Sequence, residues 1–225
     1  PIAFAIDDLE ESCQQITDSL EIGKAETEEV VESTVRDLNE LSSNIESLIR
    51  TAKLFGELTT QTEYQLIKVE DVIDDVVWIV RDLAKDYKVR VTWEKPNKMH
   101  LARANPSHLQ QVLLNTLMNG IQQIDEMRLK RQMLMGEVDI SLNFVKHDRD
   151  AYVEILIQDN GPGIHEAIWE RIFEWGYTLG RQDGNGLGLF IARNLLDGIG
   201  GVIKVQNSYR FWGTTFCIQL PANIS

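Results

Sequence analysis

Apolar residues in the first sixty positions recur in alternating steps of three and four, the spacing of a helix that packs along one seam. The first run comprises Ile2, Ile6, Leu9, Cys13, Ile16 and Leu20. The second run comprises Val31, Val35, Leu38, Leu41, Ile45, Leu48, Ala52 and Phe55. Because residues 21–25 interrupt the pattern, it predicts an antiparallel helical hairpin.

The apolar stripe on each of these helices is wider than one partner helix can cover. Pairing of two hairpins into a four-helix bundle would bury both stripes, so we predict a homodimer formed through the hairpin. The alternative is a hairpin that docks on the rest of its own chain. Light scattering that finds only monomer would favour this alternative.

Beyond residue 65 the pattern changes to a mixture of helices and alternating strands. Helical spacing predicts helices over residues 69–85 and from Ser107 to about Met127, the second with Ser107 as N-cap behind Pro106. Alternation predicts strands near residues 89–93, 138–144, 153–157, 202–205 and 216–220. These elements predict an α+β fold in which helices cover one face of a mostly antiparallel or mixed sheet. We place the domains at residues 1–60 and 66–225.

Charge and composition narrow the possible partners. The chain has 35 acidic and 22 basic residues, a formal net charge of −13, which argues against nucleic acid as a partner. Cys13 and Cys217 are too few and too far apart for a disulfide framework, so we expect buried thiols in a reducing compartment. No apolar run approaches the ~18 residues of a membrane helix, so we expect no membrane insertion by this segment.

Amide side chains line one face of the helix that begins at Ser107. Asn115, Asn119 and Gln122 fall at i, i+4 and i+7, opposite a row of leucines. Magnesium takes one or two protein oxygens and completes its shell with phosphates and waters, so Asn119 is a candidate ligand. Amides that cap a loop or face water are the alternative.

A tight turn follows the strand near residues 153–157. Asp159 is followed by Gly161, Pro162 and Gly163, so a flat ring can approach the backbone closely. The carboxylate of Asp159 can accept a hydrogen bond from the exocyclic amine of adenine, and it would repel the carbonyl of guanine. Taken alone, the motif also fits an ordinary β-turn.

A second glycine-rich stretch, residues 183–189, leads into the helical run that starts at Phe190. Glycines at a helix N-terminus free amide N–H groups to point at phosphate oxygens, and the helix dipole favours negative charge there. The stretch is neither a P-loop nor a dinucleotide fingerprint, because no Gly-Lys-Ser/Thr follows and no strand runs directly into it. A glycine-rich helix start without a ligand is the alternative.

An aromatic segment, residues 173–181, separates the two glycine motifs. It could form a lid over a bound nucleotide, with Arg181 near the phosphates and the aromatic residues anchoring the hinge. Aromatic residues that pack on the core are the alternative.

The order of these motifs resembles that of the ATP-binding domain of sensor histidine kinases. Residues 115–119 resemble the N box, 159–163 the G1 box, 173–178 the F box, 184–188 the G2 box and 213–216 the final glycine-threonine motif. The resemblance covers about residues 69–221. It implies the ATP-binding sandwich fold shared with Hsp90, DNA gyrase and MutL.

The resemblance also implies Mg-ATP as cofactor and a role for several residues. It implies that Asn119 holds magnesium, that Asp159 reads adenine and that Thr214 or Thr215 supports the base through water. Asn115 and Asn119 are the expected catalytic residues. The implied ATP site comprises Asn119, Gln122, Asp159, Gly161, Gly163, Ile164, Tyr177, Thr178, Arg181, Gly184, Gly186, Leu187, Gly188, Leu189, Thr214 and Thr215. The sequence departs from the family at Gln122, where a basic residue is common, and at Trp175-Gly176, where a proline-containing turn is common.

The hairpin is similar to the dimerisation and phosphotransfer domain of the same kinases. There the acceptor histidine lies a few residues before a proline that Pro1 resembles, and none of His100, His108, His147 and His165 falls in the hairpin. We therefore expect the acceptor just upstream of Pro1, in a longer protein. The resemblance implies a cytoplasmic kinase, or the cytoplasmic portion of a membrane-bound sensor, that passes the phosphoryl group to an aspartate of a response-regulator receiver domain.

Two other functions remain open on the sequence. One is a nucleotide-binding pseudokinase or scaffold that lacks an acceptor histidine even in the complete chain. The other is an ATPase of the Hsp90 or MutL kind, which would need a glutamate base one turn before the metal-binding asparagine. Asn115 occupies that position, and an amide cannot take a proton from water. The sequence therefore favours the kinase over the ATPase.

Overall fold

The computed structural model describes residues 64–131, 135–147, 150–178, 186–209 and 212–222. The predicted hairpin, its dimer and the 1–60 domain lie outside these residues.

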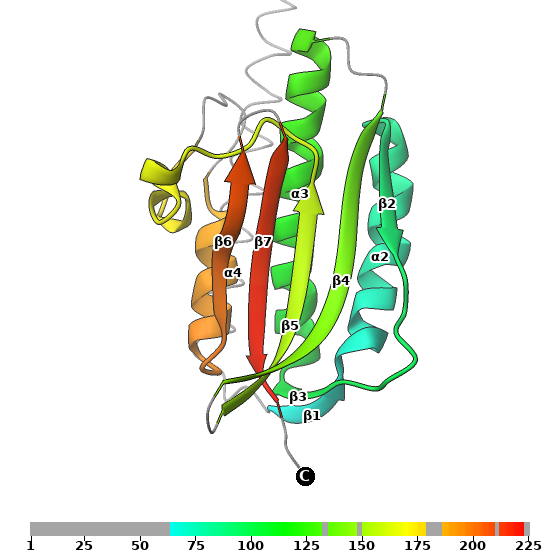
Figure 1. Ribbon diagram of the computed structural model, residues 1–225, viewed down its shortest axis with the longest axis vertical. Coiled ribbons are helices and arrows are strands. Elements are labelled where there is room, and N and C mark those ends of the chain that lie inside the picture. The colour runs from blue at the N-terminus through cyan, green and yellow to red at the C-terminus, as the bar shows by residue number, and fades with distance from the viewer. Residues whose placement is uncertain (1–63, 132–134, 148–149, 179–185, 210–211, 223–225) are drawn as a thin grey trace, which may run out of the picture. The chain divides into compact units, whose positions relative to one another are not determined.

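A five-stranded sheet forms one layer of this part (Figure 1). Its strands are β2 (Val89–Trp93), β4 (Gly136–His147), β5 (Asp150–Asp159), β6 (Val202–Tyr209) and β7 (Gly213–Pro221). They lie in the order β2-β4-β5-β7-β6, and only the β2–β4 pair is parallel. The mixed sheet agrees with the predicted α+β class.

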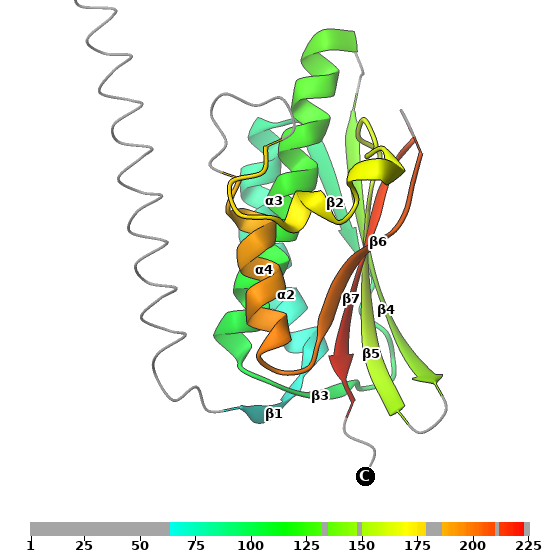
Figure 2. The ribbon, with the colours of Figure 1, turned by 90° about the vertical axis from the view of Figure 1, so that its left-hand side faces the viewer.

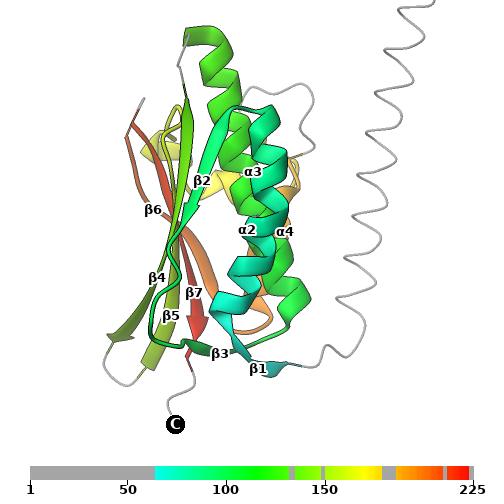
Figure 3. The same cartoon turned by 90° about the vertical axis from the view of Figure 1, so that its right-hand side faces the viewer.

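Three helices cover one face of this sheet (Figures 2 and 3). They are α2 (Val69–Asp86), α3 (Pro106–Arg131) and α4 (Gly188–Asp197). The strands turn their apolar side chains toward these helices, as in β5, where buried residues occupy alternate positions. None of the helices in the described ranges is long and apolar enough to cross a membrane.

The core lies between the helices and the sheet. Its largest fully buried side chains are Phe216, Ile73, Leu109, Leu113, Leu117, Ile121, Ile124, Ile155, Ile157, Leu196, Ile203 and Ile218. The leucine row of α3 is thus a core face, which leaves the amide row of the same helix on a different side. Two short 3₁₀ helices, η1 (Glu166–Ile168) and η2 (Arg171–Phe173), follow the end of β5.

The start of α3 differs from the prediction by one residue. Pro106 is the first helical residue, where its fixed φ suits the helix and its missing N–H costs nothing. The N-cap is Asn105, because its side-chain oxygen accepts a hydrogen bond from the backbone N–H of His108 at 3.1 Å. The prediction of Ser107 as the cap is therefore wrong.

A small two-stranded sheet was not predicted. It pairs β1 (Gln65–Lys68) antiparallel with β3 (Leu101–Ala104), at the end of the molecule where α2 begins. Each strand has only four residues, so neither repeats an apolar alternation long enough to be read from the sequence.

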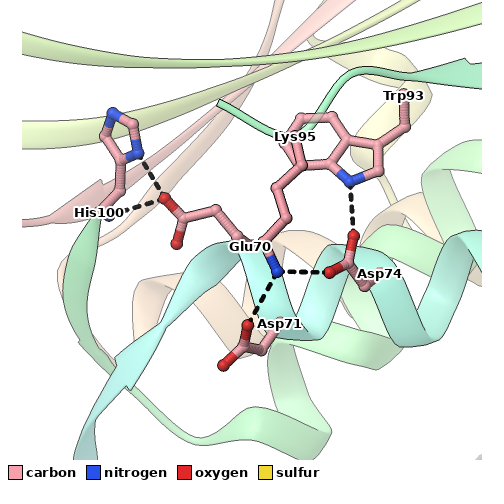
Figure 4. Close-up of polar contacts among 6 residues, drawn as sticks. All are labelled: Glu70, Asp71, Asp74, Trp93, Lys95 and His100. Atoms are coloured by element: carbon pink, nitrogen blue, oxygen red, sulfur yellow. Dashed lines mark hydrogen bonds and ion pairs between the residues drawn. The ribbon is translucent and has the colours of Figure 1, made fainter. Parts of the chain in front are cut away.

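A buried glutamate–histidine pair joins the residue before β3 to α2 (Figure 4). Glu70, 3% exposed, accepts a hydrogen bond from the backbone N–H of His100 at 2.7 Å, and its Oε1 lies 2.6 Å from the Nδ1 of the same histidine. The backbone N–H of Val69 donates to the carbonyl of His100 at 3.1 Å. The first turn of α2 is therefore fixed to β3 by both main-chain and side-chain contacts.

A second polar cluster lies on the surface beside this pair (Figure 4). The Nζ of Lys95 lies 3.1 Å from Asp71 and 2.6 Å from Asp74. Asp74 also accepts a hydrogen bond from the indole of Trp93 at 2.8 Å. Lys95 holds the pKa of Asp74 below its usual value.

Candidate functional site

Four segments that are distant in sequence meet at one end of the sheet. They are the middle of α3, the turn after β5, the start of α4 and the start of β7 (Figures 1 and 2). These segments come so close together at several of their glycines that a side chain there would collide with a neighbouring segment.

Asp159, the last residue of β5, is buried at this end and only 6% exposed. Its Oδ1 accepts hydrogen bonds from the backbone N–H groups of Gly161 at 2.8 Å and Thr214 at 3.2 Å. Burial raises the pKa of Asp159 to about 6, and these two donors act in the opposite direction. The described residues leave Oδ2 without a hydrogen bond, so an ionised acceptor remains available at neutral pH.

Glycines bring three other segments against Asp159. A Cβ on Gly161 would lie 2.8 Å from Oδ1, and a Cβ on Gly213 would lie 1.8 Å from the main-chain oxygen of Asp159. Gly213 also has φ of +99°, which favours glycine. On α3, a Cβ on Gly120 would lie 3.6 Å from Oδ2. Asp159 is therefore next to the α3 turn that carries Asn119.

Ser208 holds the turn after β5 to β7. Its hydroxyl accepts a hydrogen bond from the N–H of Ile164 at 2.6 Å and donates to the carbonyl of Gly213 at 3.1 Å. It also lies 3.0 Å from the hydroxyl of Thr214. Within the turn, Gly163 adopts a left-handed φ of +75°, which favours glycine. Sequence reasoning missed Ser208, because its partner Ile164 lies far away along the chain.

Sequence reasoning left open which of Thr214 and Thr215 supports the base, and the structure places the two side chains on different faces of β7. Along β7, Thr214, Phe216 and Ile218 share one face, and the last two belong to the core. Thr214 therefore lies on the helix-covered face, as Asp159 does. Thr215 pairs with Gln158 and points to the opposite face of the sheet. Of the two threonines of the predicted site, Thr214 thus shares the face of Asp159 and Thr215 lies on the other face.

The start of α4 lies against Asn115. A Cβ on Gly188 would lie 3.7 Å from the Cβ of Asn115. The side chains of Leu187 and Leu189 are buried, so they anchor the start of the helix and leave only their main-chain groups to a ligand. Asn115, Asn119 and Gln122 are all half-buried.

Gly186 brings the stretch before α4 against the aromatic segment. It has φ of +62°, and a Cβ there would lie 2.5 Å from the carbonyl carbon of Gly176 and 2.7 Å from the backbone of Tyr177. Tyr177 is therefore beside the phosphate-binding candidate, and Thr178 follows as an exposed residue. Arg181 and Gly184 lie outside the described residues.

The aromatic segment is anchored to the core and to α4. Phe173 is buried and contacts Phe216 edge to face at 6.4 Å. Trp175 is 57% exposed and packs edge to face on Phe190 at 5.1 Å. The guanidinium of Arg193 lies 4.1 Å from the centre of the Phe173 ring. The interpretation of these aromatics as packing residues therefore holds for Phe173.

The sandwich fold and this convergence of glycine turns around a buried aspartate define a class of nucleotide-binding domains. Residues 104–224 match the family described as "Histidine kinase-, DNA gyrase B-, and HSP90-like ATPase", and the chain belongs to this family. Its relative ZraS and its structural neighbour MprB both carry the name of a sensor histidine kinase, which confirms the resemblance stated from the motifs.

Among curated relatives, the sensor histidine kinase ZraS of Salmonella typhimurium is 28% identical over 196 residues, which cover 87% of this chain and 38% of that protein. Sporulation kinase D of Bacillus subtilis is 25% identical, with 87% and 35% covered. The chain thus spans about a third of the length of these relatives.

Two solved structures share the fold. The mycobacterial sensor histidine kinase MprB is 25% identical with a TM-score of 0.57, and the match covers 72% of this chain and 100% of that one. Full-length ShkA in complex with AMPPNP is 24% identical with a TM-score of 0.64, and covers 86% of this chain and 39% of that one.

Proposed function

We propose that the chain is the core of a sensor histidine kinase of a two-component system. It binds Mg-ATP and transfers the γ-phosphoryl group to a histidine upstream of Pro1, from which the group passes to an aspartate of a response-regulator receiver domain. The observation that carries the proposal is the meeting of Asp159, the amide face of α3 and the start of α4 at one end of the sheet.

Each part of the proposed site suits one part of the nucleotide. The free Oδ2 of Asp159 accepts the hydrogen bond from the exocyclic amine of adenine, and Thr214 lies beside this position. The main-chain N–H groups at Gly186 and Gly188 donate to phosphate oxygens, where the dipole of α4 favours negative charge. Tyr177, Thr178 and Arg181 belong to the proposed lid, and Gly184 belongs to the proposed phosphate-binding stretch.

The residues present also fit magnesium. Among the described residues no group of three or more histidine, cysteine or acidic side chains gathers as a metal site. Asn119 offers a neutral oxygen, which suits an ion that takes most of its ligands from phosphate and water. When bound, magnesium supplies neutralisation of the phosphate charge.

In the proposed transfer, an imidazole nitrogen of the acceptor attacks the γ-phosphorus. The bond from phosphorus to the bridging oxygen of ADP breaks, a phosphorus–nitrogen bond forms, and the imidazole loses its proton. Such transfer depends mainly on positioning and on charge neutralisation, so the contribution of the protein is to hold the nucleotide and exclude water. The dimer through residues 1–60 and the cytoplasmic location are parts of the same proposal.

Calorimetry with Mg-ATP tests the binding step. We expect micromolar-range affinity in the wild type and no measurable binding in Asp159→Asn, because an amide has lost the charge and can turn its NH₂ toward the adenine amine. Unchanged affinity in the variant would refute the assignment of Asp159.

A longer chain tests the transfer step. With residues upstream of Pro1 included, γ-labelled ATP should give an acid-labile, base-stable phosphate on the protein. Mg-ATP binding without any such label, or a longer chain without a histidine within about one helical turn, ~4 residues, before Pro1, would favour the pseudokinase or scaffold instead.

A further inference from the structure

Helix α2 exposes three large apolar side chains outside its buried face. The helix lies at the β2 edge of the helix layer (Figures 1 and 3). Trp78 is 81% exposed, and Ile79 and Leu83 are exposed as well. The buried face, which includes Val76 and Val80 and packs on α3 and β2, does not contain them. Neighbouring exposed apolar residues with a polar rim are typical of an interaction site.

Aspartates lie between these apolar side chains. With 3.6 residues per turn, Asp75 and Asp82 fall in directions between Trp78 and Ile79, about one turn before and one turn after them. Asp86 continues the same acidic row at the end of the helix. The surface that we call the α2 patch consists of Trp78, Ile79, Leu83, Asp75, Asp82 and Asp86. It presents a row of carboxylates with an indole on one side and two aliphatic side chains on the other.

The carboxylates of the α2 patch are only partly neutralised. The Nζ of Lys85 lies 2.9 Å from Asp82, and both side chains are largely exposed. The side chains of Asp75 and Asp86 make no hydrogen bond or ion pair with other residues of the described ranges. The patch therefore keeps an excess of negative charge beside its apolar side chains.

Charge decides between the possible occupants of the α2 patch. Residues 1–60 contain 14 acidic and 4 basic residues, and a second copy of the patch would place aspartates against aspartates. Like charges across an interface cost free energy, so both of these occupants are disfavoured. A positively charged segment is favoured twice, because an arginine or lysine can pair with an aspartate and can also lie over the indole of Trp78.

We propose that the α2 patch is the docking site for a second protein, which binds through a segment of arginine or lysine side chains flanked by apolar ones. A basic side chain placed between Trp78 and Ile79 contacts the face of the indole and pairs with Asp75. The apolar neighbours in the segment pack on Ile79 and Leu83. Tryptophan is among the residues that contribute most to protein interfaces. The patch shares no residue with the proposed ATP site, so the inference does not rest on the proposed function.

Photo-crosslinking in the native host tests the inference. The full chain carries the photoreactive amino acid benzoylphenylalanine in place of Ile79, which leaves Trp78 and the aspartates intact. A control chain carries it in place of Phe144, which is 52% exposed on β4. We expect position 79 to join a second protein at a segment where arginine or lysine neighbours apolar residues. Position 144 should not join that segment.

Charge reversal then tests the chemistry of the contact, with a synthetic peptide of the crosslinked segment as the probe. Asp75→Lys should weaken binding of the full chain to this peptide by roughly ten-fold or more, because it replaces an attraction with a repulsion. Trp78→Ala should weaken it by a similar factor. The control is Asp139→Lys, at an exposed position of β4, which should change the affinity by less than about two-fold. Urea unfolding checks that the three variants are folded.

Three results would overturn the inference. The first is no crosslink from position 79, or a crosslink to residues 1–60 or to a second copy, which would assign the patch to the chain itself. The second is a crosslinked segment without arginine or lysine. The third is no loss of affinity in Asp75→Lys, or an equal loss in Asp139→Lys, which would assign binding to net charge. None of these results involves nucleotide, so they are distinct from a failure of Mg-ATP binding.

Discussion

At the scale of the residue, Asp159 has a proposed role in binding, and its burial as a carboxylate lowers the stability of the unliganded protein. The folded-state pKa of about 6 exceeds the ordinary value of 3.8. The stability linked to this group is therefore fully present below about pH 3.8 and is lost as the pH rises through about 6. A ligand that pairs with the ionised carboxylate offsets that loss.

Asp159→Asn should therefore stabilise the unliganded protein at pH 8. The amide oxygen can still accept from the N–H groups of Gly161 and Thr214, and the buried charge is gone. We expect the free energy of unfolding in urea to rise by about 1 to 3 kcal/mol, with a smaller gain at pH 5, where Asp159 is mostly protonated. An equal gain at both pH values would contradict the account.

Gly213 and Gly176 form a matched pair for testing the close approach to Asp159. Both have positive φ, +99° and +72°, but a Cβ would lie 1.8 Å from the oxygen of Asp159 only at Gly213, whereas nothing lies within 4 Å at Gly176. Gly176→Ala should cost about 1 to 2 kcal/mol for the backbone conformation alone. Gly213→Ala should cost more than about 4 kcal/mol or prevent folding.

Thermal unfolding of the two variants measures this difference. Similar midpoints for Gly213→Ala and Gly176→Ala would mean that the contact with Asp159 relaxes easily. The binding site would then tolerate more backbone movement than the packing indicates.

The sequence indicated candidate site residues that belong to a recognisable motif. It did not indicate residues whose role depends only on the partner that they contact in the fold. Asp159, its glycines and Asn115 stand in short local patterns with a chemical meaning, so they could be named as candidate site residues. Ser208 is an ordinary polar residue whose role depends on which atoms it contacts, and nothing local marks it.

At the scale of the element, the buried pair of Glu70 and His100 helps to fix the first turn of α2 to the residue before β3. His100→Leu would leave the carboxylate of Glu70 with a single main-chain donor, and we expect a loss of about 2 to 4 kcal/mol in the free energy of unfolding. The double variant Glu70→Leu with His100→Leu should lose less than the sum of the single variants. Urea unfolding of the wild type, the two single variants and the double variant measures these losses.

The exposed ion pair between Asp71 and Lys95, in the neighbouring surface cluster, is the control. Asp71→Ala removes one partner of Lys95 at the surface, where ion pairs contribute about 0 to 1 kcal/mol. A loss at Asp71 as large as that at His100 would show that burial is not the deciding factor.

Element existence was easier to predict than element boundaries. The long helices and the alternating strands of the sheet were predicted because each repeats its apolar spacing several times. The cap of α3 was placed two residues late, because Asn105 and Ser107 are both good caps and only the position of Pro106 at the first helical residue decides between them.

At the scale of the whole molecule, we expect the part after residue 63 to fold and bind by itself. A fragment of residues 64–225 should be monomeric in light scattering and should bind Mg-ATP with the affinity of the full chain, because the residues of the proposed site all follow residue 63. The full chain should be dimeric through the predicted hairpin. A dimeric fragment, or a monomeric full chain, would contradict the division into these two parts.

The order of motifs predicted the fold family but not the order of strands. Nothing in the alternation of residues 89–93 shows that β2 pairs parallel with β4, because that pairing requires α3 to cross between them. The family resemblance implied the sandwich as a whole, and the register of individual strands came only from the structure.

Helix α3 gives the molecule a mechanical property. It has 26 residues, so it is about 39 Å long, and it starts directly after β3, whose partner β1 immediately follows residue 63 (Figure 1). A helix hydrogen-bonded at every turn resists compression along its axis. Asn115 and Asn119 therefore lie on the same stiff element as the helix end that adjoins β3, about 14 and 20 Å along the axis from its first residue.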